Sequence, residues 1–233
     1  MAKYIKVLTV TYNTEISYKE IPLFRGAVLH SMGDRANLLY HNHTSKNTFR
    51  YSYPLIQYKR IGGKATIVCI EEGTDVIGQF LSETTKSIRI GEREAICETD
   101  KIAPAKSLMQ TWNHPFSYQI FRWLPLNKEN YRKYQETEGV IEKVSLLEGI
   151  LKGNLLSMLK GLDIFLDDEL TLKITNLSEP YILHNKNVAL MAFNADFICN
   201  LSIPDNVGIG KNASIGYGII HRKKKEEQHK DNK

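Results

Sequence analysis

The chain has few cysteines and no long apolar run. Cys69, Cys97 and Cys199 are odd in number and far apart within 233 residues, which argues against disulfides or a zinc knuckle and predicts core thiols in a reducing compartment. No apolar stretch approaches the roughly 18 residues that a membrane helix needs. Residues 1–6 contain no apolar h-region of a secretory signal. We therefore expect a cytoplasmic protein that has no membrane partner.

The sequence also lacks a strong net charge. The formal charge is +5, and residues 222–233, with six basic and three acidic side chains, contribute +3 of it. The preceding residues therefore carry little excess charge, and bulk charge alone does not indicate nucleic-acid binding. The low apolar content of residues 222–233 predicts a charged, disordered tail.

The first half of the chain alternates strand and helix patterns in a recognisable order. A strand is expected over residues 6–12, a helix over 18–32, an extended segment over 51–59 and a second strand over 64–70, with Gly62 and Gly63 forming the turn between the last two. A short helix over 76–81 and strands over 87–90 and 94–102 complete the series. The resulting order, β-α-β-β-α-β, is typical of a ferredoxin-like unit, which is also the topology of the RNA-recognition module.

A similar pattern begins again after Pro104. A strand is expected over residues 114–124, helices over 127–135 and 140–160, and further strands over 170–174, 181–183 and 188–203, the last interrupted around Asn194. The sequence thus predicts an α+β fold of two tandem ferredoxin-like (RNA-recognition-module-like) domains with antiparallel sheets. The expected domains are residues 1–105 and 106–221, followed by the tail.

Residues 208–218 form a glycine-rich segment with four glycines, Lys211 and Ser214. Glycines permit positive φ and close backbone approach, so amide groups can form an anion-binding concavity suited to phosphate. A Walker loop is excluded, because Lys211 follows the wrong glycine and Asn212 stands where a hydroxyl is needed. A dinucleotide fingerprint is excluded because only fifteen residues follow Gly218. The alternative interpretation is a glycine-rich hairpin that lets the chain turn beside a helix.

Three of the seven histidines, His30, His41 and His43, fall within fourteen residues. One imidazole can accept a proton from an RNA 2′-hydroxyl while a second donates to the leaving oxygen, and this chemistry needs no metal. The expected products are a 2′,3′-cyclic phosphate and a 5′-hydroxyl. Two alternatives stay open: His41 and His43 as metal ligands, although no third ligand has convincing spacing, or two loop histidines without an active role.

Basic residues could bind the phosphates of such a substrate. Charge developing on the phosphorane would be stabilised by a nearby cation, for which Lys46, Arg50 and Lys59 are candidates. A phosphate-contacting stripe is predicted from Arg25, Lys59, Arg60, Lys64 and Lys211, with ordinary solvated charges as the alternative.

Four blocks of the chain together resemble one protein family. They are Phe24-Arg25-Gly26-Ala27, His41-Asn42-His43, Tyr51-Ser52-Tyr53-Pro54-Leu55-Ile56-Gln57-Tyr58-Lys59, and the glycine-rich segment from Val207 to Gly218. In combination they resemble the CRISPR-associated repeat-processing endoribonucleases of the RAMP (repeat-associated mysterious protein) superfamily. The resemblance implies two ferredoxin-like domains that bind the repeat of a precursor CRISPR RNA and cut it once, without a metal or other cofactor, to release guide RNAs for antiviral defence.

The resemblance also implies roles for particular residues. The catalytic histidine would be His41 or His43, with the other as its partner, while Tyr40, Lys46 and Tyr51 stay candidates for a further catalytic role. Some relatives bind RNA without cutting it, so a noncatalytic RNA-binding subunit of a CRISPR effector complex is the alternative function. Effector-complex subunits and a second copy of the chain are therefore further candidate partners. The residues predicted to bind RNA are Arg25, Lys46, Lys59, Lys64, Gly208, Gly210, Lys211, Ser214, Gly216 and Gly218.

Overall fold

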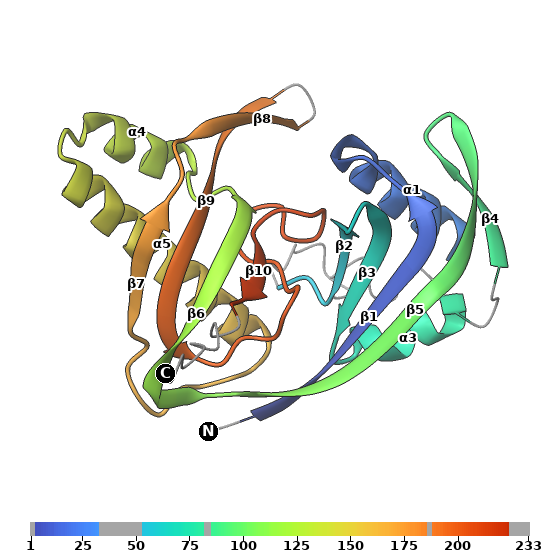
Figure 1. Ribbon diagram of the computed structural model, residues 1–233, viewed down its shortest axis with the longest axis horizontal. Coiled ribbons are helices and arrows are strands. Elements are labelled where there is room, and N and C mark those ends of the chain that lie inside the picture. The colour runs from blue at the N-terminus through green and yellow to red at the C-terminus, as the bar shows by residue number, and fades with distance from the viewer. Residues whose placement is uncertain (1–2, 33–52, 82–84, 186–187, 224–233) are drawn as a thin grey trace, which may run out of the picture.

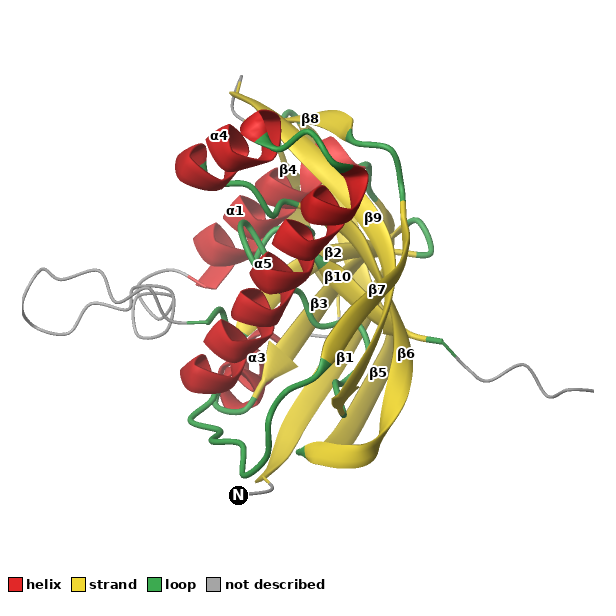
Figure 2. Cartoon of the chain, turned by 90° about the vertical axis from the view of Figure 1, so that its left-hand side faces the viewer, coloured by secondary structure: helices red, strands yellow, loops and turns green. Residues whose placement is uncertain are grey.

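The computed structural model describes residues 3–32, 53–81, 85–185 and 188–223. Two sheets lie side by side, and the helices cover one side of both (Figures 1 and 2). Within the described residues, no helix is both long enough and apolar enough to cross a membrane.

The first domain builds its sheet from five antiparallel strands in the order β2-β3-β1-β5-β4. Strand β5 lies beside β1 and β3 beside β1 on the other side, so β5-β1-β3-β2 is the ferredoxin-like arrangement and β4 extends it at one edge. A short 3-10 helix, Tyr18–Glu20, precedes the first α-helix. The elements are β1 (Lys3–Glu15), α1 (Ile21–Met32), β2 (Ile56–Ile61), β3 (Lys64–Ile70), α3 (Gly73–Leu81), β4 (Thr85–Ile90) and β5 (Arg93–Met109).

The second domain repeats this arrangement, with the order β10-β6-β9-β7 and β8 paired to β9. Two helices connect β6 to β7, but residues 202–218, which are described throughout, contain no helix where the first domain has α3. The elements are β6 (Thr111–Trp123), α4 (Lys128–Glu136), α5 (Val140–Gly161), β7 (Leu172–Leu177), β8 (Tyr181–Asn185), β9 (Val188–Leu201) and β10 (Ile219–Arg222). The predicted fold class is confirmed.

Helix α5 and strands of both sheets share one hydrophobic core. The buried face of α5 repeats at helical spacing through Leu147, Leu151 and Leu155. These side chains belong to a cluster that contains Trp123 of the second sheet and Ile5 of the first. Burying one such side chain contributes about 1.5–3 kcal/mol, so the two domains stabilise each other through this core.

The strands extend further than the sequence predicts in one place and bulge in another. Strand β5 continues through Pro104, where it pairs only with β1, because β4 pairs with β5 no further than Glu98. A proline is tolerated there because one edge of the strand needs no N–H donor. The irregularity expected at Asn194 is present, but the extra residue belongs to β6: Phe121 and Arg122 face the single residue Asn194.

The three cysteines are free and buried, which confirms their predicted place in the core. Burial raises the pKa of the Cys69 and Cys199 thiols to about 12. The first residues of the predicted tail are ordered parts of the second domain: Arg222 ends β10, and Lys223 Nζ forms an ion pair with Asp196 Oδ2 at 2.7 Å. Residues 224–233 lie outside the described residues.

Candidate nucleic-acid interface

The glycine-rich loop, residues 207–218, lies between the domains against the free edge of β2. The Tyr58 N–H donates to the Ser214 carbonyl at 2.8 Å, and Tyr58 and Ile215 form a parallel bridge. Strand β2 is the edge of the first sheet, so the loop supplies a partner from the second domain. The edge is thereby closed and the domains are joined by backbone pairing.

Gly208 is bound by side chains of the first domain. Its N–H donates to Gln57 Oε1 at 2.7 Å, and its carbonyl accepts from the Tyr53 hydroxyl at 2.9 Å. The Gln57 Nε2 in turn donates to the Tyr53 oxygen at 2.9 Å. A Cβ at position 208 would lie 2.9 Å from Lys59 Nζ and 3.0 Å from two loop carbonyl oxygens. Only glycine fits this contact without displacing its neighbours.

Two more glycines of the loop are required by backbone geometry. Gly218 has φ +61°, and a Cβ there would clash with the Ile209 carbonyl oxygen. Gly210 has φ +75° and approaches Asn154 of α5, whose Oδ1 accepts from Trp123 Nε1 at 2.9 Å. The loop therefore does turn beside a helix, as the alternative interpretation expected, while Gly210 and Lys211 stay exposed at its tip.

Lys59 lies beneath this loop with its side chain pointing away from solvent. Its exposed fraction is 0%, and Nζ has no hydrogen-bond partner in the described part of the chain. Burial lowers the pKa of the amine to about 7. An RNA phosphate could reach Nζ only if the loop moved, so RNA binding by Lys59 stays a prediction.

The other predicted phosphate-binding residues lie in different surroundings. Arg25 is half-buried on α1, and Lys211 is exposed. Lys64 at the start of β3 already has an ion pair, with 2.8 Å between its Nζ and Asp100 Oδ2. The backbone of Ser214 contacts β2, whereas Gly216 packs against Ile21 at the start of α1.

The predicted catalytic residues His41 and His43, together with Tyr40, Lys46, Arg50 and Tyr51, lie outside the described residues. The segment that carries them leaves the described chain at Met32 and rejoins it at Tyr53. Because the Tyr53 hydroxyl donates to Gly208, that point of return lies directly against the glycine-rich loop.

Sequence reasoning missed two residues that organise this region. Gln57 is a buried polar side chain within the apolar run that includes Ile56 and Tyr58; a glutamine in such a run was the available signal. Arg122 has a positive φ of +52° within a strand, and nothing in the local sequence indicates this conformation.

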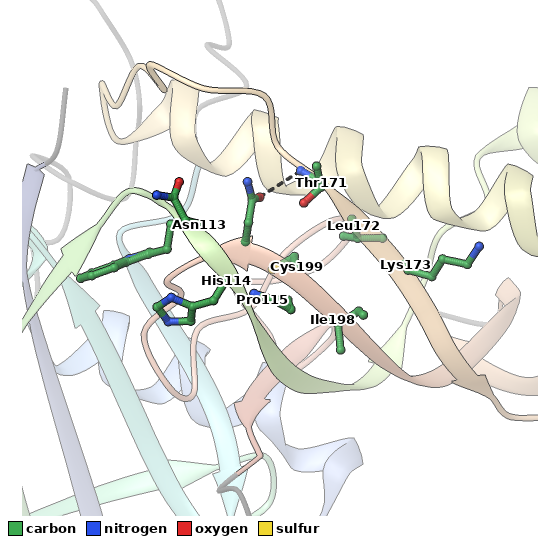
Figure 3. Close-up of a pocket in the computed structure, with 10 residues that line it drawn as sticks. Asn113, His114, Pro115, Thr171, Leu172, Lys173, Ile198 and Cys199 are labelled. Carbon is green, nitrogen blue, oxygen red and sulfur yellow. Dashed lines mark hydrogen bonds between the residues drawn. The ribbon is translucent and has the colours of Figure 1, made fainter.

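A separate hollow of about 550 Å³ lies at the other end of the second sheet. Figure 3 shows His114 and Pro115 from β6, Lys173 from β7 and Ile198 from β9 along it. The glycine-rich loop contributes no lining residue. In the parts of the chain that the structure describes, no group of three or more His, Cys, Asp and Glu side chains could hold a metal ion; His41 and His43 lie outside those parts.

Two ferredoxin-like domains joined by a glycine-rich loop before the last strand define a protein of the RAMP superfamily. The family models of the Cas6b N-terminal and C-terminal domains match residues 3–107 and 110–223. The chain therefore belongs to the Cas6b family, and the resemblance predicted from the sequence is confirmed.

Solved structures agree with this assignment. A Cas6b crystal structure is 25% identical, with a TM-score of 0.81 over 94% of this chain and 100% of that one. A structure described as the CRISPR RNA processing endoribonuclease Cas6b is 23% identical, with a TM-score of 0.71 and the same coverage, and supports the fold. An uncharacterized protein of Methanocaldococcus jannaschii is 36% identical over 103 residues, which are 44% of this chain and 69% of that protein.

Proposed function

We propose that this protein is an endoribonuclease that cuts precursor CRISPR RNA within the repeat and releases guide RNAs. The observation that carries the proposal is the match to both Cas6b domains, over residues 3–107 and 110–223. The loop geometry supports it further, since the segment with His41 and His43 rejoins the described chain at Tyr53, beside Gly208.

The proposed chemistry uses the substrate as its own nucleophile and needs no metal. One of His41 and His43 removes the proton of the 2′-hydroxyl, and O2′ attacks the adjacent phosphorus. The bond from phosphorus to O5′ breaks, and the other imidazole, as imidazolium, gives its proton to O5′. A 2′,3′-cyclic phosphate and a 5′-hydroxyl result. Lys46 or Arg50 would stabilise the charge that develops on the phosphorane.

The glycine-rich loop would hold the RNA beside this chemistry. Its exposed tip, Gly210 and Lys211, is the part that a phosphate can approach, while Gln57 and Tyr53 fix its buried side. At this tip Lys211 supplies a cation, and the neighbouring glycine lets the backbone approach a ligand closely.

The test is cleavage of end-labelled repeat RNA by the purified protein in excess chelator. The wild type should make a single cut, and His41→Ala or His43→Ala should slow it by about 10² or more. His184→Ala, which removes an exposed imidazole from β8, is the matched control and should cut at the wild-type rate.

Two other results would point to the alternatives. Cleavage that stops in chelator would favour a metal-dependent nuclease with His41 and His43 as ligands. Tight binding without a cut would favour a noncatalytic RNA-binding subunit of a CRISPR effector complex. Effector subunits and a second copy of the chain are the further partners that we propose, and the cytoplasm, in keeping with the free thiols, is the proposed place of action.

A further inference from the structure

Two arginines from different domains meet at one tyrosine near the end of the glycine-rich loop. Arg60 of β2 places its Cζ 5.0 Å from the centre of the Tyr18 ring, and Arg122 of β6 places its Cζ 4.0 Å from the same centre. Tyr18 precedes α1 and is 43% exposed. Arg60 and Arg122 are each partly exposed as residues, although Arg122 Nε itself is buried.

The two like charges have no acidic partner in the described part of the chain. The acidic side chain nearest to Tyr18 in sequence, Glu20, is already bound: its carboxylate accepts from Arg93 Nε at 2.7 Å and from the Ser17 N–H at 2.8 Å. The Arg60 Nε donates to the carbonyl of Ile16 at 2.7 Å, which orients its guanidinium without neutralising it. Two cations that contact the same ring without an acidic partner favour an anionic ligand.

Arg122 is held in place at a conformational cost. Its φ of +52° lies in the left-handed region, which is unfavourable for a side chain of this size. Its N–H donates to Asn194 Oδ1 at 2.9 Å, and its guanidinium lies 4.9 Å from the centre of the Tyr217 ring. The Nε is buried and has no hydrogen-bond partner among the described residues. Strain that the surroundings maintain in this way is typical of binding sites.

We propose that Arg60 and Arg122 bind backbone phosphates of the RNA, with the partly exposed Tyr18 beside them. The inference rests on the proposed function and extends it by a second contact region. That region is continuous with the glycine-rich loop, because the Gly218 N–H donates to the Arg122 carbonyl at 3.1 Å. A strand of RNA held by Lys211 at the loop tip would thus meet further cations from both domains.

The test measures repeat-RNA affinity over a series of salt concentrations, in a His41→Ala, His43→Ala background so that no cut interferes. Each phosphate contact contributes about 0.7 to the slope of log affinity against log salt for a single strand. Arg60→Gln or Arg122→Gln should lower the slope by that amount and weaken binding about fivefold at 0.1 M salt. Arg89→Gln removes the same charge from exposed β4 and should change neither quantity.

Three outcomes decide the matter. An unchanged slope in both variants, with a lowered melting temperature, would mean that the pair only joins the domains and would overturn the proposal. If Arg122→Gln does not fold, Arg60→Gln decides, because Arg60 lies in a regular strand with ordinary backbone angles. If the arginine variants have reduced slopes but the wild-type protein does not cut repeat RNA, this site is supported and the proposed catalytic function is wrong. If the variants keep the normal slope and the wild-type protein cuts, the catalytic function is supported and this site is wrong.

Discussion

Replacing Lys59 by Met should stabilise the protein at neutral pH, and the gain should shrink as the pH rises. The side chain is 0% exposed, and its amine has no hydrogen-bond partner in the described part of the chain. Burial lowers its pKa from 10.5 to about 7. Folding must therefore bury a charge or release a proton, whereas methionine fills a similar volume without either cost.

The pKa of Lys59 is lower in the folded state, so the unfolded state binds more protons between about pH 7 and pH 10.5. The free energy of unfolding therefore rises with pH in this window, by at most ~1.4 kcal/mol per pH unit. The full penalty applies below pH 7 and disappears above the unfolded value. Between pH 7.5 and 9.5 this linkage should stabilise the wild type by about 2–3 kcal/mol, and Lys59→Met should lack that gain.

The buried thiols change the free energy of unfolding with pH in the opposite direction, so their contribution must be subtracted. Burial raises the pKa of Cys69 and Cys199 to about 12, so their contribution is complete below the ordinary thiol pKa and is lost as the pH rises above it. Both proteins contain these cysteines. The difference in unfolding free energy between wild type and Lys59→Met therefore isolates the amine.

The assay is urea unfolding of wild type, Lys59→Met and Lys211→Met at pH 7.5, 8.5 and 9.5. Lys211→Met removes an exposed lysine from the glycine-rich loop and leaves Lys59 of β2 in place, so it should keep the wild-type dependence on pH. A difference between wild type and Lys59→Met that stays constant over this range would refute the reasoning. So would a Lys59→Met protein that is less stable at every pH, because the amine would then have a stabilising partner.

Two further substitutions test how the loop is held. Gly218→Ala should lower the free energy of unfolding by about 1–3 kcal/mol, because φ is +61° and the new Cβ meets the Ile209 carbonyl. Gly26→Ala on α1, which has open space around it, should instead raise the free energy of unfolding by about 0.5–1 kcal/mol. Equal melting temperatures for the two variants would contradict this prediction. Gln57→Leu leaves the buried Gly208 N–H without its acceptor and should cost about 1–3 kcal/mol in urea unfolding, a result that a wild-type midpoint would rule out.

Local patterns predicted most of the fold because they depend on neighbours in sequence. The strand at residues 64–70 and the helix beginning at Val140 follow from apolar periodicity. The same patterns could not predict that β5 continues through Pro104, since that depends on which strand lies beside it. The bulge at Arg122 likewise depends on the Asn194 side chain across the sheet.

The candidate site was harder to predict because burial cannot be read from residue type. A lysine is usually exposed, yet Lys59 is covered by a loop that lies about 150 residues later in the sequence. Gln57 lies in one of the blocks that resemble the family, but no role was predicted for it, because its hydrogen bonds to Gly208 form only in the folded chain.

The place of the glycine-rich loop in the topology explains why its sequence allowed two interpretations. It occupies the connection from β9 to β10, where the first domain places α3 between its third and following strands. Without a helix there, the chain turns beside α5 and pairs with β2, which requires glycine at positions 208 and 218. At the exposed tip Gly210 is required in the same way, whereas the Lys211 side chain is exposed. Structural and RNA-binding roles therefore divide by face: Gly218→Ala should act on folding first, and Lys211→Met on RNA affinity with the unfolding midpoint unchanged.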